Sequence, residues 1–177
     1  LITEGQSVTF VYVDSTQGWV NIQDSTSNVR GNPNLVATGG SITTSGNCKI
    51  HTFTGPGTFT VTNASSTAAE NIVSYLVVGG GGGSGSSCAG GGGGAGGYRE
   101  LKSPLTPYTA SPLDGYPSAP NRVTVTAQAY PITVGSGGAG GAGSANGSQG
   151  NDSVFSTITS AGGGFGGGPS SGASGGS

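Results

Sequence analysis

The first candidate for a ligand-binding site is a glycine-rich segment that follows an apolar stretch of the chain. Gly80 to Gly85 read G-G-G-G-S-G, which matches the G-x-G-x-x-G pattern of dinucleotide-binding loops, and Glu100 follows twenty residues after the first of these glycines. That pattern binds a pyrophosphate only where a helix opens at the glycines. The chain continues instead with S-S-C-A and five more glycines, which cannot form that helix. We therefore expect no dinucleotide site and no cofactor.

The other reactive side chains are scattered. His51 is the only histidine, and no nucleophile or carboxylate stands near it in the sequence, so we expect it on a sheet surface. Four aspartates lie singly in turns, where this residue usually bonds the backbone: Asp14, Asp24, Asp114 and Asp152. No His/Cys group has the spacing of a zinc site. The chain is therefore expected to hold no metal and to have no enzymatic activity.

Two cysteines, Cys48 and Cys88, stand 40 residues apart. Two interpretations remain open at this point. They are free, partly buried thiols, or they form one disulfide that ties the first half of the chain to the glycine-rich half. The redox compartment decides between the two.

Charge and hydropathy exclude two classes of partner. The net charge is −2 and the five basic residues are single, so no basic patch indicates nucleic acid. The apolar stretch 72–78 is far too short to span a membrane, and we expect no membrane insertion. The chain begins without a signal-peptide pattern. It has no methionine, so it is either processed or a piece of a longer protein, and we expect a piece because the end, S-S-G-A-S-G-G-S, also looks like an interruption.

The first 66 residues are typical of a small β protein. Alternating apolar residues predict a hairpin of residues 8–12 and 19–23 around a turn at 14–18, with Trp19 packed on the sheet. Weak strands follow at 35–38 and 41–44. K-I-H-T-F-T, G-P-G, T-F-T-V-T then predicts a second hairpin that turns at 55–57. We expect an N-terminal sandwich or barrel over 1–66, and at most one helical turn in 63–70.

The second half, 67–177, alternates strands with glycine. Strands are expected at 72–78, 98–102, 123–130 with a continuation at 132–134, and 154–161. A proline-rich insertion, 103–120, predicts a rigid extended loop. Four tyrosines bracket it: Tyr98, Tyr108, Tyr116 and Tyr130. Tyrosines on rigid loops suit contact with sugars or protein surfaces, and the alternative is that they pack against the sheet and the prolines.

The glycine runs are the main feature of the sequence, since 39 of the 177 residues are glycine. The two longest runs are Gly79, Gly80, Gly81, Gly82 and Gly83, and then Gly90, Gly91, Gly92, Gly93 and Gly94. They are either flexible linkers or extended three-residue-per-turn helices that pack side by side, because only glycine permits so close an approach. Since strands punctuate the runs, we favour packed polyglycine II-type runs in an all-β fold.

Several stretches also resemble a known kind of virion protein. They are S-V-T-F-V-Y-V-D-S-T-Q-G-W-V-N-I-Q-D-S (7–25), H-T-F-T-G-P-G-T-F-T-V (51–61), Y-L-V-V-G-G-G-G-G (75–83), G-G-G-G-A-G-G-Y (91–98), I-T-V-G-S-G-G-A-G-G (132–141) and S-V-F-S-T-I-T-S-A-G-G-G (153–164). In this order they resemble the glycine-rich tail-fibre and adhesin proteins of marine tailed phages, cyanophages especially.

The resemblance implies a function that the residues alone do not. It implies a structural protein of the virion tail or fibre, outside the cell, that contributes to host attachment through loops on a glycine-rich scaffold. The implied partners are further copies in a homotrimer, other tail proteins, and a host glycan or outer-membrane protein. Two alternatives remain: a purely structural fibre or decoration protein without a receptor, and a bacterial extracellular filament protein.

Overall fold

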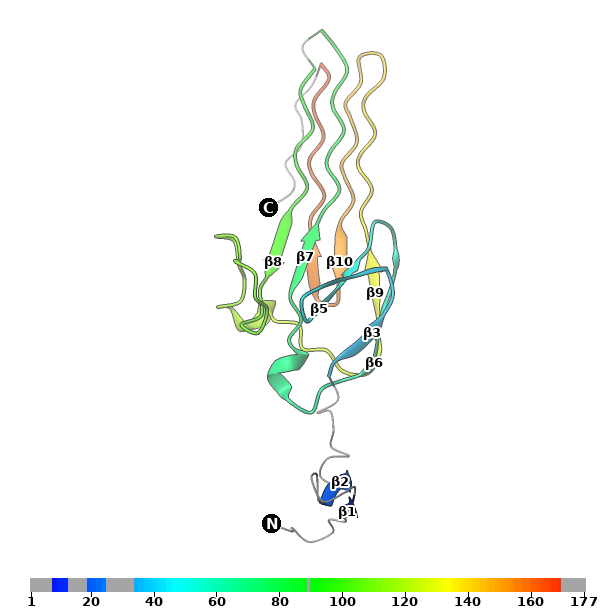
Figure 1. Ribbon diagram of the computed structural model, residues 1–177. Helices are drawn as coiled ribbons and strands as arrows, with labels where there is room; N and C mark the ends of the chain where they lie inside the picture. The colour runs from blue at the N-terminus through cyan, green and yellow to red at the C-terminus, as the bar shows by residue number, and fades with distance from the viewer. Residues whose placement is uncertain (1–7, 13–18, 25–33, 89, 170–177) are drawn as a thin grey trace.

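The computed structural model describes residues 8–12, 19–24, 34–88 and 90–169. These residues form antiparallel strands and two 3-10 turns without an α-helix, which confirms the all-β class. The expected helical turn is the 3-10 helix η1 (Ala68–Asn71), and η2 (Ala119–Asn121) is the other. The strands are β1 (Val8–Tyr12), β2 (Trp19–Asp24), β3 (Val36–Thr38), β4 (Ser41–Ser45), β5 (Cys48–Thr52), β6 (Gly57–Asn63), β7 (Tyr75–Val78), β8 (Tyr98–Leu101), β9 (Ala129–Thr133), β10 (Ser153–Phe155) and β11 (Ile158–Ser160) (Figure 1).

The first hairpin is confirmed, since β1 and β2 pair with each other in antiparallel register. The turn expected at 14–18 and the side chain of Trp19 lie outside the described residues.

The largest sheet crosses the boundary expected between residues 66 and 67. Its strand order is β11-β10-β9-β6-β3, so β3 and β6 from the first half pair with strands of the glycine-rich half. Phe59 in β6 lies opposite Tyr130 in β9. The expected self-contained sandwich over 1–66 is therefore not found in the described part, because β6 satisfies one of its two edges with β9.

The predicted hairpin of residues 49–54 and 58–62 is wrong in its pairing. β5 pairs with β4, where Ser45 lies opposite Cys48 across a turn of two residues that begins at Gly46. Gly46 has a φ of 57°, a left-handed conformation that glycine adopts without strain. The Gly55–Gly57 segment instead carries the chain from one sheet to the other. The ring of His51 still meets Phe59 edge-on, at 5.1 Å between centroids.

The strand expected at 154–161 is in fact the hairpin of β10 and β11, which turns at Ser156 with a φ of 54°. The strand expected at 123–130 is reduced to a single bridge between Ile72 and Thr124. β9 begins only at Ala129 and passes through Pro131, which lies opposite Thr58.

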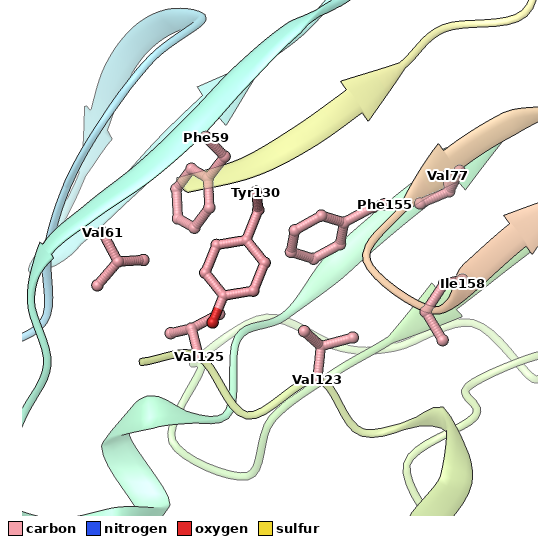
Figure 2. Packing of buried hydrophobic residues seen from close by; sticks show 8 residues of the cluster. All are labelled: Phe59, Val61, Val77, Val123, Val125, Tyr130, Phe155 and Ile158. Atoms are coloured by element: carbon pink, nitrogen blue, oxygen red, sulfur yellow. The ribbon is translucent and has the colours of Figure 1, made fainter. Parts of the chain in front are cut away.

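One apolar core holds these strands together. Three aromatic rings, Phe59, Tyr130 and Phe155, lie at its centre, with centroid separations from 6.1 to 6.4 Å (Figure 2). The valines and isoleucine around them complete the cluster: Val61, Val77, Val123, Val125 and Ile158. These residues come from both halves of the chain and fix the strands from which the glycine runs depart.

Candidate functional site

Five glycine-rich runs extend from the strands and lie side by side (Figure 1). We number them in chain order and call them together the glycine slab. Run 1 (79–86) follows β7, run 2 (90–97) precedes β8, run 3 (135–143) follows β9, run 4 (145–151) precedes β10 and run 5 (161–168) follows β11. The strands are thus the base of the slab.

Hydrogen bonds between runs 1 and 2 recur at every third residue. The amide N–H groups of run 1 donate to carbonyl oxygens of run 2 at Gly79 to Gly97 (2.9 Å), Gly82 to Gly94 (2.8 Å) and Gly85 to Gly91 (2.9 Å). A three-residue repeat is that of the polyproline II helix, which has no internal hydrogen bonds and must find partners outside itself. The runs are therefore packed polyglycine II-type segments, as predicted, and not flexible linkers.

The same three-residue period joins run 1 to run 4. Gly80, Gly83 and Ser86 donate to Asn151, Ser148 and Ala145 at 2.8 to 2.9 Å. Run 2 bonds run 5 in the same way, and run 5 also bonds runs 1 and 4. Run 3 bonds run 1 in parallel and run 4 in antiparallel direction. These bonds define two rows, with runs 2, 1 and 3 in one and runs 5 and 4 in the other.

Steric contacts explain why the inner positions are glycine. A Cβ atom on Gly82 would lie 2.0 Å from the carbonyl oxygen of Gly164, and one on Gly83 would lie 1.9 Å from that of Ala139. Run 3 carries its own side chains at Ser136, Ala139 and Ala142, three residues apart and all exposed. In run 3, the non-glycine residues therefore stand at the one position of each three-residue repeat whose side chain points away from the neighbouring runs.

Side chains close the ends of the slab. At the base, the hydroxyl of Ser153 accepts a hydrogen bond from the N–H of Gly135 (2.9 Å), and the carboxylate of Asp152 accepts one from Gly162 (2.8 Å). Further along, the side-chain oxygen of Asn146 accepts the N–H of Gly168 (2.7 Å). Asp152 thus serves the backbone, as the sequence predicted.

The proline-rich insertion is anchored at Glu100, whose side chain is only 8% exposed. The hydroxyl of Ser111 donates to the Glu100 carboxylate, and the hydroxyl of Tyr98 donates to it at 2.9 Å. The Ser111 bond is the main cause that lowers the pKa of Glu100 below its usual 4.5. The Asp114 carboxylate accepts the N–H groups of Lys102 (2.9 Å) and Tyr116 (3.0 Å), so this aspartate also serves the backbone.

The four tyrosines have different surroundings. Tyr98 and Tyr108 are 37% and 40% exposed and offer their rings to the surface. Tyr116 is half-buried, and the guanidinium of Arg122 lies 4.3 Å from its ring centroid. Tyr130 is buried in the core, and its hydroxyl accepts the N–H of Thr126 at 2.8 Å. Tyr130 is thus placed where no surface partner can reach it.

A groove of about 690 Å³ lies between the base and the insertion. Tyr98, Glu100 and Leu113 line it together with Thr157 and Thr159 of the β10–β11 hairpin. Of the four tyrosines that the sequence singled out, Tyr98 lines this groove, where it is exposed together with Leu113.

Both cysteines are free thiols, with Cys48 half-buried at the start of β5 and Cys88 exposed between runs 1 and 2. The disulfide considered from the sequence is not formed. His51 is half-buried on the sheet, with its Nδ1 2.8 Å from the carbonyl oxygen of Gly39. Among the described residues no group of His, Cys, Asp and Glu could hold a metal ion. The side chains of Asp14 and Asp24 lie outside this part.

The fold and the slab define a class of protein in which a β base carries a packed layer of polyglycine helices. The model of a family described as "Glycine-rich domain" matches residues 52–177, and the chain belongs to that family. No curated protein and no solved structure matches the chain significantly. Within the described residues, no helix has the length and apolar character needed to cross a membrane.

Proposed function

We propose that the protein is a structural component of a phage tail or tail fibre that contributes to attachment to the host cell. One observation carries this proposal. The connection between runs 1 and 2 and the connection between runs 3 and 4 emerge together at the end of the slab away from the strands (Figure 1). A stiff scaffold that displays short loops at its tip is suited to contact with a surface.

The stiffness follows from the hydrogen bonds. Each run is bonded to at least two others at every third residue, so one run cannot move without breaking bonds to its neighbours. Binding residues are commonly carried on loops that a rigid scaffold holds in place. The connections between the runs meet this requirement without any catalytic group.

A second surface of the same protein supports contact with a host molecule. Tyr98 presents an exposed ring at the groove, and Tyr108 presents one within the insertion. Tyrosine supplies contact area at low cost in conformational entropy. A host glycan or an outer-membrane protein is the class of partner that these surfaces suit, and the virion outside the cell is the location that goes with it.

A purely structural role in the virion is the second candidate, and the slab itself favours it. Packed polyglycine serves equally as a stiff spacer that needs no receptor. The two candidates differ in whether the isolated chain binds host cells.

Binding of the full chain to intact cyanobacterial host cells separates them. The chain is labelled at its N-terminus, because Cys88 lies in one of the connections. We expect saturable binding that whole phage displaces. Two variants locate the contact: Ser144→Arg in the exposed connection and Tyr108→Ala in the insertion, each expected to weaken binding. Thr43→Arg, on the exposed strand β4, is the matched control and is expected to bind normally. A folded chain that binds no host cell, or binding that phage does not displace, would contradict attachment and favour the structural role.

A further inference from the structure

Within the described part of the chain, run 1 is enclosed on one side only. It bonds runs 2, 5, 4 and 3, and these neighbours form an unbroken arc because run 2 bonds run 5, run 5 bonds run 4 and run 4 bonds run 3. Among the described residues no hydrogen bond joins run 3 back to run 2. The outer face of the row of runs 2, 1 and 3, which we call the open face, is therefore not covered by any other run of the described residues.

Glycines on the open face are not required by the packing of the chain itself. The nearest atom would lie 3.7 Å from a Cβ on Gly81, 3.6 Å from a Cβ on Gly137 and 3.5 Å from a Cβ on Gly140. All three distances are ordinary van der Waals contacts. In regular structure glycine is less favourable than alanine, because it loses more conformational freedom on folding. Run 3 uses alanine and serine at its other outward positions, so glycine at these three positions has another cause.

The open face also presents unpaired backbone groups at the lattice spacing. In the described part of the chain, the N–H groups of Gly81 and Ser84 donate no hydrogen bond, and the carbonyl oxygens of Gly82 and Gly85 accept none. At the other two positions of the three-residue repeat of run 1, the N–H groups donate to runs 2 and 4, and the carbonyl oxygens accept from runs 3 and 5. Donors and acceptors thus alternate along an exposed edge, as they do on the edge strand of a β-sheet, which is a template for another chain.

Side-chain size separates the two rows. The exposed residues on or beside the open face are glycine, alanine or serine: Gly81, Ser84, Gly92, Ala95, Gly137 and Gly140. The row of runs 5 and 4 carries Phe165 and Gln149. Only the first row keeps a surface that another polyglycine run can approach closely.

We propose that a second copy of this chain packs on the open face, run against run, so that one polyglycine lattice continues through both molecules. A second copy is the occupant because this surface needs a partner with exposed glycine runs that offer both donors and acceptors, and the same face of another copy supplies them. No charged side chain stands in runs 1, 2 or 3 to select a charged partner. Runs pack in both parallel and antiparallel directions within the slab, so a two-fold arrangement meets no obstacle in chain direction.

A face that packs on the same face of another copy forms an isologous interface, which closes as a dimer. This differs from the trimer that the resemblance to phage fibres implies. The proposal does not depend on attachment to a host, since it concerns only how two copies meet.

Sedimentation of the full chain tests the proposal. We expect the wild type to sediment at twice its chain mass of 16.8 kDa at micromolar concentration. Gly81→Gln and Gly137→Gln place side chains where the slab has room for a Cβ but a second copy would lie, and we expect each to weaken association at least tenfold. Ser148→Gln adds the same side chain to an exposed position of run 4 and should leave the dimer intact.

Amide exchange at Gly82 and Gly85 checks the fold of each variant, because these groups bond run 2 only while the slab is formed. A wild type that stays monomeric up to its solubility limit would overturn the proposal. Association that both glutamine variants leave unchanged would also overturn it, and a trimer would overturn the two-fold arrangement.

Discussion

Alanine in place of Gly83 tests the close packing of runs 1 and 3. Its Cβ would lie 1.9 Å from the carbonyl oxygen of Ala139, and real Cβ atoms essentially never come within 3.0 Å of another atom. The two runs would have to separate by at least about an ångström. The bonds from Gly138 to Gly81 and from Gly141 to Ser84, both 2.8 Å, would then exceed hydrogen-bonding distance.

The magnitude follows from those two bonds. A backbone hydrogen bond contributes about 0.5–1.5 kcal/mol net, and a buried group left without a partner costs about 1–3 kcal/mol. Gly138 and Gly141 are half-buried, so we expect Gly83→Ala to lower the free energy of unfolding by roughly 2–4 kcal/mol. Gly81→Ala is the matched control, because its Cβ has 3.7 Å of room. It should be neutral or stabilise by about 0.4–1 kcal/mol through the unfolded state.

Urea unfolding followed by circular dichroism measures both variants, at a dilution where each sediments as a monomer. The account requires Gly83→Ala to be clearly less stable than Gly81→Ala, although the two glycines belong to one run and differ by two positions. If the two variants were equally stable, the close packing derived from the inner glycines would be refuted.

Three further predictions follow from the site. The hydrogen bond from the Ser111 hydroxyl lowers the pKa of Glu100, so its carboxylate stabilises the fold above pH 4.5, and this contribution is lost as the pH falls through the lower pKa of the folded state. Thermal unfolding should show a loss of stability below about pH 4.5, and Glu100→Gln should reduce that loss. If the variant had the same acid profile as the wild type, the anchoring role of Glu100 would be contradicted. A thiol reagent should modify two cysteines of the folded chain without prior reduction, Cys88 faster than Cys48, because both are free and Cys88 is exposed; a chain that reacts only after reduction would contain the disulfide. Gly147→Ala should lower the free energy of unfolding by about 2 kcal/mol, since its Cβ would lie 2.2 Å from the carbonyl oxygen of Gly83. Ser148→Ala, at an exposed position, should change the free energy of unfolding by no more than about 0.5 kcal/mol. If the two variants had equal unfolding midpoints, the packing of run 4 against run 1 would be contradicted.

The packed glycine runs could be predicted because strands interrupt them. A linker has no reason to alternate with strands of one sheet, and this alternation indicated runs 1, 2, 3 and 5. Run 4 was missed, because residues 145–151 hold only two glycines and look like two turns. Gly147 and Gly150 are the positions that face run 1, where a Cβ would come within 2.2 and 2.1 Å of a carbonyl oxygen. A three-residue spacing of glycine, and not a high glycine count, was the signal.

Strand pairing could not be derived from local pattern alone. Two glycine turns, at Gly46 and at 55–57, compete to close a hairpin on β5, and both have suitable chemistry. The choice is made by β6, which joins β9 so that Phe59, Tyr130 and Phe155 form one cluster. These contacts join residues that are far apart in the sequence. They also place β6 in one sheet with strands of the glycine-rich half, so no domain boundary falls at residue 66. The turn of the β10–β11 hairpin was hidden because Ser156, and not glycine, takes the left-handed conformation.

The surface residues were predicted in part. The proline-rich insertion marked the four tyrosines around it as candidates for surface contact, and Tyr98 and Tyr108 are indeed exposed. Tyr130 is buried because its strand, β9, is the central strand of the large sheet and its ring faces the core. The anchoring of the insertion by Glu100 and Ser111 depends on residues eleven positions apart that no local pattern connects.

Amide hydrogen exchange along run 1, read residue by residue by NMR, tests the polyglycine slab most directly. In the monomer the account predicts slow exchange at Gly79, Gly80, Gly82, Gly83 and Gly85, whose N–H groups are bonded to runs 2 and 4, and fast exchange at Gly81 and Ser84. Such a pattern, with one fast residue in every three, belongs only to a packed three-residue helix. Uniformly fast exchange from Gly79 to Gly85 would show flexible linkers and contradict the account.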